Sequence, residues 1–476
     1  MVDVAIIGCG VIGAAAAYHL AQRQVSVLIL EAENDVSMGT TKANSAILHA
    51  GYDPKPGTQM AQLNVRGSAM AKEICKKLDV PYKQIGSLVL AFSEEDLQHV
   101  KKLYENGVAN GVPEMKILDA QEVKAMEPNL SDEVVGALYA PSAAIVSPWE
   151  YALAMAENAV QNGVDLRLET RVIGLEKIEN GWHIKTNQGD FEARFVINAA
   201  GVDAGVIHEM AAPAQFKTVP CRGEYYLLDK SEGNRVNHVI FQCPSKVGKG
   251  VLVAPTVHGN LIVGPNAEDI ADSGDTANTA KGLAAVAENA RRSVPNVDLR
   301  ASIRNFAGIR ANTDQSDFIL DWAAPGLLDL AGMKSPGLSA AAAVGEKAMQ
   351  MLMQAGLSMP EKTDVVTTRQ RIRFKELSAA EKAKLIQEQP AYGKIICRCE
   401  TITEGEIVAA CKTPIPPRSI DGVKRRTGAG MGRCQGGFCG PRVMELLSRE
   451  LGESPLNISQ DQAGAMILTG VTKQGG

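Results

Sequence analysis

Residues 2–31, VDVAIIGCGVIGAAAAYHLAQRQVSVLILE, decide the fold of this 476-residue chain. The apolar run 2–7 predicts a short buried strand. Residues 14–22 predict a helix, and residues 25–30 predict a second strand that ends at Glu31. This order of strand, turn, helix and strand is a βαβ unit, so the sequence predicts an α/β fold of the Rossmann type.

The first turn of this unit carries the chemistry. It holds the pattern G-x-G-x-x-G at Gly8, Gly10 and Gly13. Such glycines allow a tight turn and let a pyrophosphate approach the N-terminus of the following helix. Glu31 suits the hydroxyls of a ribose and would repel a 2′-phosphate. We therefore expect FAD or NAD rather than NADP, whereas a lone glycine-rich turn in the core is the plainer alternative.

Several later segments extend this pattern. A polar stretch rich in small residues occupies 39–51, and a predicted strand at 191–197 runs into the small-residue turn NAAG at 198–201. Residues 215–265 alternate apolar and polar positions, which predicts an antiparallel sheet. The chain then reaches GMKSPG at 332–337, which is expected to open a long helix.

A second cofactor is predicted near the C-terminal end. Four of the nine cysteines form a C-x-C pair and a C-x4-C pair, at Cys397, Cys399, Cys434 and Cys439. Four thiolates in two close pairs hold zinc or an iron–sulfur cluster. Because a redox dinucleotide is predicted at the other end of the chain, we favour a [2Fe–2S] cluster, with zinc or unligated thiols as alternatives.

Basic residues lie beside these cysteines, at Lys424, Arg425, Arg426 and Arg433. They are interpreted in three ways: they offset the negative charge of a cluster, they dock an acidic partner, or they form a solvated basic loop.

Composition sets limits on the class of protein. The formal net charge is −5, which gives no reason to expect a nucleic-acid partner. No apolar run reaches the roughly 18 residues that span a bilayer, and the chain starts without a basic leader. The cysteines are therefore expected to be reduced thiols and the protein cytoplasmic. Peripheral association with a membrane stays open.

These features resemble the D-amino-acid-oxidase-like superfamily of FAD-dependent oxidoreductases over about residues 1–355. Within it, NSAILHAG at 44–51 and RGEYY at 222–226 look like the L-2-hydroxyglutarate dehydrogenase branch. The cysteine region is similar to the bacterioferritin-associated-ferredoxin type of module, which ends the large subunit of anaerobic glycerol-3-phosphate dehydrogenase. The resemblance implies FAD and [2Fe–2S] as cofactors.

The resemblance also implies a domain organisation. A discontinuous FAD-binding domain is expected to contain an inserted substrate-binding domain with an antiparallel sheet, and a small α-rich module is expected to follow. The expected ranges are 1–75, 145–210 and 300–360 for the FAD-binding domain, 76–144 and 211–299 for the substrate-binding domain, 361–393 for a linker, 394–452 for the [2Fe–2S] module and 453–476 for a tail with a flexible end.

Oxidation of an alcohol by a flavin requires a base and a fixed positive charge for an anionic substrate. His49 is the candidate base, and Arg310 and Lys334 are the candidate catalytic cations. Arg222 and Tyr226 are weaker candidates for substrate binding. The expected cofactor-binding residues are Gly8, Gly10, Gly13, Glu31, Thr40, Thr41, Asn44, Ser45, Val172, Gly201, Gly332 and Gly337.

We therefore expect an FAD-dependent dehydrogenase that oxidises a small anionic secondary alcohol and passes electrons through the cluster to an acceptor protein or partner subunit. Glycerol 3-phosphate is favoured, and an oligomer is expected. The sequence reads Tyr52-Asp53-Pro54 where glycerol-3-phosphate enzymes usually carry an arginine, so a 2-hydroxy acid such as L-2-hydroxyglutarate is the first alternative. An amino or imino acid substrate is another, and an electron-transfer subunit reduced by NADH is the alternative of a different class.

Overall fold

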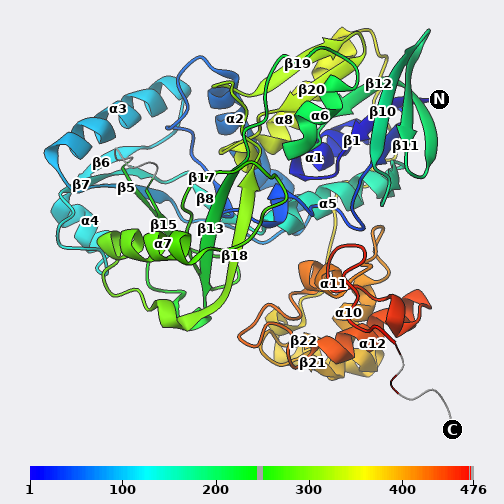
Figure 1. Cartoon of the computed structure of the whole chain (residues 1–476). Coiled ribbons are helices and arrows are strands. Elements are labelled where there is room, and N and C mark those ends of the chain that lie inside the picture. The colour runs from blue at the N-terminus through cyan, green and yellow to red at the C-terminus, as the bar shows by residue number, and fades with distance from the viewer. Residues whose placement is uncertain (244–249, 471, 473–476) are drawn as a thin grey trace.

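Two large β-sheets lie above a small helical module in the computed structural model, which describes residues 1–243, 250–470 and 472 (Figure 1). The residues 473–476 of the predicted flexible tail lie outside the described parts. The first sheet holds the predicted βαβ unit. The second sheet is built mostly from the predicted insertions and also contains one strand from beyond residue 300.

The first sheet runs in the order β10-β11-β12-β1-β2-β9, with β20 beside β12 and β19 beside β20. Strand β1 is parallel to both β2 and β12, as a Rossmann-like sheet requires. The strands are β1 (Val2–Ile7), β2 (Val27–Leu30), β9 (Asp165–Arg167), β10 (Val172–Ile178), β11 (Gly181–Thr186), β12 (Gly189–Asn198), β19 (Ile319–Ala324) and β20 (Leu327–Ala331). The predicted α/β fold is thereby confirmed.

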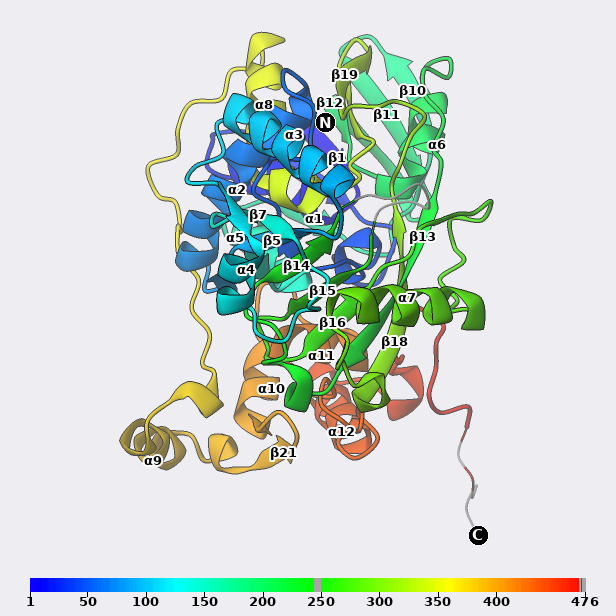
Figure 2. The ribbon, with the colours of Figure 1, turned by 90° about the vertical axis from the view of Figure 1, so that its left-hand side faces the viewer.

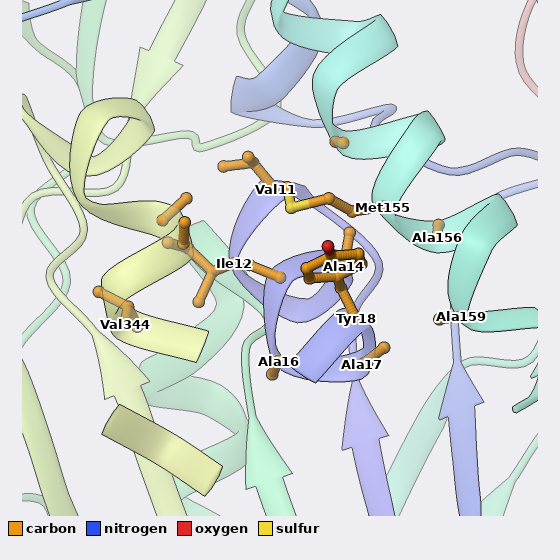
Figure 3. Close-up of a cluster of buried hydrophobic side chains, with 14 of the residues drawn as sticks. Val11, Ile12, Ala14, Ala16, Ala17, Tyr18, Met155, Ala156, Ala159 and Val344 are labelled. Carbon is orange, nitrogen blue, oxygen red and sulfur yellow. The ribbon is translucent and has the colours of Figure 1, made fainter. Parts of the chain in front are cut away.

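Helix α1 (Val11–Leu20) is the centre of the core beside this sheet, and nine of its ten residues are buried. It begins at Val11 rather than at residue 14, because Gly10 is its N-cap. Figure 3 shows its small side chains lying between α5 (Pro148–Gln161), which contributes Met155, and α8 (Gly337–Gln354), which contributes Val344. The alanines of α1 allow this close helix packing.

The second sheet combines strands from both predicted insertions. It runs β17-β13-β16-β15-β14-β5-β7-β6, with β18 paired to β13. Most pairs are antiparallel, but β5 and β14 are parallel. The strands are β5 (Ser87–Ala91), β6 (Lys116–Asp119), β7 (Gly136–Ala140), β13 (Cys221–Leu228), β14 (Val239–Gln242), β15 (Leu252–Pro255), β16 (Leu261–Gly264), β17 (Glu268–Asp269) and β18 (Ser302–Arg310). The expected domain boundary at residue 300 precedes β18, which nevertheless pairs within this second sheet.

Further elements complete the two large units. Helices α3 (Glu94–Asn110), α4 (Ala120–Met126) and α7 (Ala280–Ser293) contact the strands of the second sheet. Helix α2 (Gln59–Lys77) packs on α8, and α6 (Ala204–Glu209) packs near β20. A three-stranded sheet is formed by β3 (Ile47–Leu48), β8 (Ala144–Val146) and β4 (Tyr82–Gln84).

The segment after α8 runs down one side of the molecule to α9 (Ala379–Glu388), as Figure 2 shows. Ion pairs hold this linker to the body: Arg369 with Glu157 at 2.7 Å, Arg371 with Glu150 at 2.9 Å, and Arg373 with Asp79 at 2.6 Å.

The C-terminal module is rich in helices, as predicted. It contains β21 (Ile395–Cys397), β22 (Ile402–Thr403), α10 (Glu404–Ala410), α11 (Ile420–Thr427) and α12 (Gly440–Leu451). Its apolar core includes Ile407, Val423 and Leu447. Among the helices of the described residues, none is long and apolar enough to cross a membrane.

Candidate active site

A cavity of about 740 Å³ lies where the first turn, the end of β2 and the N-terminus of α8 meet. Ten of the twelve expected cofactor residues line it: Gly8, Gly10, Glu31, Thr40, Thr41, Asn44, Ser45, Val172, Gly201 and Gly337. His49, Arg310 and Lys334 line the same cavity. The structure therefore brings together segments that are more than 300 residues apart in the sequence.

The two other expected glycines serve the surrounding structure. A Cβ on Gly13 would lie 2.0 Å from the carbonyl oxygen of Gly8, so glycine lets the first turn close on α1. Gly332 has a φ of 66° and lies beside Thr313 between β20 and α8. Neither glycine lines the cavity in the structure.

The first turn forms a cradle that side chains would fill. Gly8 has a φ of 95°, and a Cβ there would lie 2.7 Å from the carbonyl oxygen of Ala199. The Val11 amide at the start of α1 donates a hydrogen bond to Oγ1 of Thr41 at 3.0 Å. This close backbone approach, beside the N-terminus of a buried helix, fits the pyrophosphate of a dinucleotide.

Glu31 closes the cavity at the end of β2. Its carboxylate accepts hydrogen bonds from the amides of Cys9 at 2.6 Å and Glu33 at 3.0 Å. Burial raises the pKa of Glu31 to about 7, because these bonds only partly offset the loss of water. The carboxylate is in the position at which the acid of this motif accepts ribose hydroxyls. This hydrogen-bond acceptor thus fits the ribose in the nucleotide part of FAD.

His49 lines the cavity from a position just after β3. Its backbone amide donates to Oγ of Ser339 at 2.7 Å, and its carbonyl accepts from Nδ2 of Asn64 at 2.9 Å. The ring stacks against Phe241 at 5.6 Å, and Nε2 lies 3.2 Å from Oγ of Ser335. These contacts orient the imidazole toward the loop that precedes α8.

Two cations line the cavity near His49. Arg310 ends β18 and donates to Sγ of Cys221 at 3.4 Å and to the carbonyl of Asn266 at 3.1 Å. Over residues 1–243, 250–470 and 472, no carboxylate forms an ion pair with Arg310. Lys334 donates to the carbonyl of Gln315 at 2.9 Å. A cavity wall with this guanidinium suits an anion.

Arg222 and Tyr226 do not line the cavity. Arg222 is buried and pairs with Asp275 at 2.6 Å and Glu268 at 2.8 Å, and Tyr226 donates to the carbonyl of Leu283. Successive residues of a strand point to opposite faces, so Tyr225 faces the cavity instead, where its hydroxyl lies 3.1 Å from Oγ of Ser45. Sequence reasoning missed Tyr225, although the same RGEYY stretch contained it.

The structure brings the four predicted cluster cysteines together within the module. Cys397 and Cys439 are buried, while Cys399 and Cys434 are exposed and their sulfurs are 4.0 Å apart. A hydrogen bond from Cys439 lowers the pKa of Cys397 to about 6. Across the described residues, no three His, Cys, Asp or Glu side chains are grouped for a single metal ion.

The thiols thus stand as two pairs, and two thiolates at each iron are the ligands of a [2Fe–2S] cluster held by four cysteines. Gly432 makes room for this arrangement, because a Cβ there would lie 2.2 Å from Cβ of Cys399. Cys411 lies apart, and burial raises its pKa to about 11.

Three of the four basic residues beside the cysteines form ion pairs with residues outside the module. Arg425 and Arg426 both bind the buried carboxylate of Asp35, at 2.9 and 2.8 Å. Arg433 pairs with Asp229 at 2.9 Å, and Lys424 is largely buried. The interpretation as a solvated loop is therefore wrong for Arg425 and Arg426.

A second cavity of about 1030 Å³ lies between the module and the rest of the protein. Arg304, Arg371 and Lys424 are among its charged lining residues. The loop at 38–44 contributes to the walls of both cavities. The module therefore docks beside the wall of the proposed FAD site.

Comparison with known proteins agrees with this geometry. The family described as FAD dependent oxidoreductase matches residues 3–351, and the BFD-like [2Fe-2S] binding domain matches residues 395–449. The glycerol 3-phosphate dehydrogenase of Caloramator mitchellensis is 50% identical over 476 residues, which cover 99% of both chains.

Two further relatives cover less of the chain. The structure of dithionite-reduced L-alpha-glycerophosphate oxidase from Mycoplasma pneumoniae with FAD bound has a TM-score of 0.73 at 30% identity, covering 77% of this chain and 98% of the other. The L-2-hydroxyglutarate dehydrogenase of Escherichia coli (strain K12) is 32% identical over 273 residues, covering 56% of this chain and 64% of the relative.

Proposed function

Because the chain belongs to the family of FAD dependent oxidoreductases and ends in a BFD-like [2Fe-2S] binding domain, we propose that it oxidises the secondary alcohol of glycerol 3-phosphate to a ketone. The observation that carries this proposal is the full-length similarity to the Caloramator glycerol 3-phosphate dehydrogenase, which extends through the cysteine module. When bound, FAD would supply the two-electron acceptor and the cluster a one-electron carrier.

The cavity supplies groups suited to this substrate. We assign the binding of the phosphate to the guanidinium of Arg310, whose planar fork matches phosphate oxygens. Lys334 adds a second positive charge at the same wall. Tyr225 and Ser45 add hydroxyl groups. Arg222 keeps a structural role in our proposal, because its charge is already matched by Asp275 and Glu268.

His49 is our candidate for the group that takes the hydroxyl proton. Its Nε2 atom is near Oγ of Ser335, which supports a fixed ring orientation in the cavity. Replacement of His49 by Asn keeps a polar group of similar size but removes the base. We expect kcat to fall by about 100-fold or more while FAD stays bound, which is the usual contribution of general base catalysis.

A separate protein is the proposed electron acceptor, because a cluster with two exposed cysteines would allow electrons to leave one at a time. We further propose a cytoplasmic location and an oligomer. Electrons from the cluster would alternatively pass to a partner subunit or to an acceptor at a peripheral membrane site.

The test is anaerobic reduction of the purified, FAD-loaded protein by each compound of a panel. Loss of the visible flavin band measures the reduction. The panel contains glycerol 3-phosphate, L-2-hydroxyglutarate, L-proline and NADH. Rapid bleaching by glycerol 3-phosphate, followed by the EPR signal of a reduced cluster, supports the proposal. Bleaching by L-2-hydroxyglutarate or L-proline alone would replace the substrate, and bleaching by NADH alone would replace the enzyme class.

A further inference from the structure

The segment Ser459–Met466, beyond the last helix of the module, is a short ordered hairpin in the structure. Ser459 bridges to both Ser419 and Met466, and Gln460 donates its amide to the carbonyl of Ala465 at 2.8 Å. The side chain of Ser459 is buried. The sequence indicated a tail here, but this part of it is attached to the start of α11.

Asp461 connects this hairpin to two other parts of the protein. Its carboxylate binds Arg425 of α11 at 2.6 Å and Lys42 of the FAD-binding part at 2.7 Å. Its carbonyl also accepts a hydrogen bond from Nδ2 of Asn34 at 2.9 Å. Burial opposes the charge of Asp461, but Arg425 and Lys42 outweigh it and lower its pKa. The hairpin is thus fixed between the module and the loop after β2.

Gln462 follows directly and lines the proposed FAD cavity, together with Lys42 and residues of the first turn. In the sequence it lies about 420 residues from the loop that carries Lys42, since Lys42 and Asp461 are 419 residues apart. Its side chain is exposed. A carboxamide can both donate and accept hydrogen bonds, so it suits the polar groups of a dinucleotide.

We propose that Ser459–Met466 is part of the FAD site, with Gln462 as a cofactor-binding side chain and Asp461 as the residue that positions it. Retention of FAD then depends on docking of the iron–sulfur module, although the two cofactors bind to different parts of the chain. The coupling is reciprocal, so bound FAD also stabilises the docked module.

The test compares three variants of the full-length, cluster-loaded protein: Gln462→Ala, Asp461→Asn and Gln460→Ala. Gln460 is the matched control, because it lies on the same hairpin and its amide binds Asp421 at 3.0 Å but does not line the FAD cavity. After removal of FAD, each protein is titrated with FAD and the quenching of flavin fluorescence gives the dissociation constant. Iron and sulfide analysis reports whether the cluster remains. No substrate is needed, so the result is independent of the proposed reaction.

We expect Gln462→Ala to weaken FAD binding by about fivefold, as for the loss of one hydrogen bond. Asp461→Asn should weaken FAD binding by about tenfold or more, because the carboxylate that pairs with Arg425 and Lys42 loses its charge. Gln460→Ala should bind FAD as the unaltered protein does. Unchanged FAD binding in Gln462→Ala would overturn the proposal. An equal loss in Gln460→Ala would overturn it too, since the effect would then come from general disturbance of the hairpin.

Discussion

Asp35 and Arg426 form a two-bonded ion pair across 391 residues of the chain, with both nitrogen–oxygen distances at 2.8 Å. Both side chains are 2% exposed. Burial would raise the pKa of Asp35, but the charges of Arg426 and Arg425 outweigh it and lower the pKa to about 2. A buried charge that loses its partner is costly, so this pair should control the attachment of the module.

Replacement of Asp35 by Asn should therefore loosen the module. The change leaves the buried guanidinium of Arg426 without its counter-charge, whereas Arg425 keeps its ion pair with Asp461. We expect a loss of about 3 kcal/mol in the free energy of unfolding. Thermal and urea unfolding of the cluster-loaded protein measures it. The control is Arg418→Ala, which removes an exposed pair with Glu169 at the same interface and should cost less than about 1 kcal/mol. Equal effects of both changes would contradict the role given to Asp35.

Binding of FAD should depend on pH through Glu31. Burial raises its pKa from 4.5 to about 7 in the FAD-free protein. Ribose hydroxyls donate to the ionised form and would lower this pKa again, so binding releases a proton. FAD affinity should thus increase as the pH rises toward about 7 and level off above it.

The stability of the FAD-free protein should change in the opposite direction. For an acid whose pKa is raised by folding, ionisation disfavours the folded state, so this contribution to stability is lost as the pH rises from 4.5 to about 7.

FAD dissociation constants measured across this pH range test the predicted rise in FAD affinity. Glu31→Gln should bind FAD more weakly and with little pH dependence, and a pH profile like that of the unaltered protein would contradict the assignment.

Arg310 should affect substrate binding far more than FAD binding. Arg310→Gln removes the positive charge that no carboxylate of the described residues matches, and we expect KM for glycerol 3-phosphate to rise about 30-fold, or roughly 2 kcal/mol. Arg310→Lys should recover part of this loss because the charge returns without the planar fork. Arg304→Gln is the matched control, since Arg304 is also on β18 but contacts Gln435 of the module. Steady-state kinetics with FAD-loaded protein decides the matter.

Cluster binding should depend on the paired cysteines alone. Cys399→Ser and Cys434→Ser should each lose the [2Fe–2S] absorption and EPR signal while FAD remains bound, because serine replaces one of four thiolates. Cys411→Ser is the control within the same module and should keep the cluster. Retention of a full cluster in Cys399→Ser would contradict the ligand set.

The fold could be predicted where the pattern is local. The G-x-G-x-x-G turn, the acid at the end of β2 and the long helix from Gly337 all follow from short-range sequence signals, and the structure contains them at or near the predicted positions. The domain boundary expected at residue 300 was harder to predict, because β18 belongs to the second sheet through its pairing with β13. Such pairing is decided by tertiary contacts.

The site shows the same division. His49, Arg310 and Lys334 were predicted because they lay in recognisable segments, and the structure places all three along one cavity. Their roles stay predictions. The choice between Tyr225 and Tyr226 needed the face of β13, and one residue of register reverses that face. The shared ion-pair partner of Arg425 and Arg426 could not be predicted from the sequence, since Asp35 lies 390 residues from Arg425.

The arginine-pinned linker has one more consequence, for the way electrons leave. Arg369, Arg371 and Arg373 attach alternate residues of the linker to α5 and to Asp79, so the module is not carried on a swinging arm. A flexible tether would let the cluster search a volume set by its length. Here the module would keep one position relative to the rest of the protein. The rate of electron transfer would then be limited by how well the acceptor fits the fixed surface around the cluster.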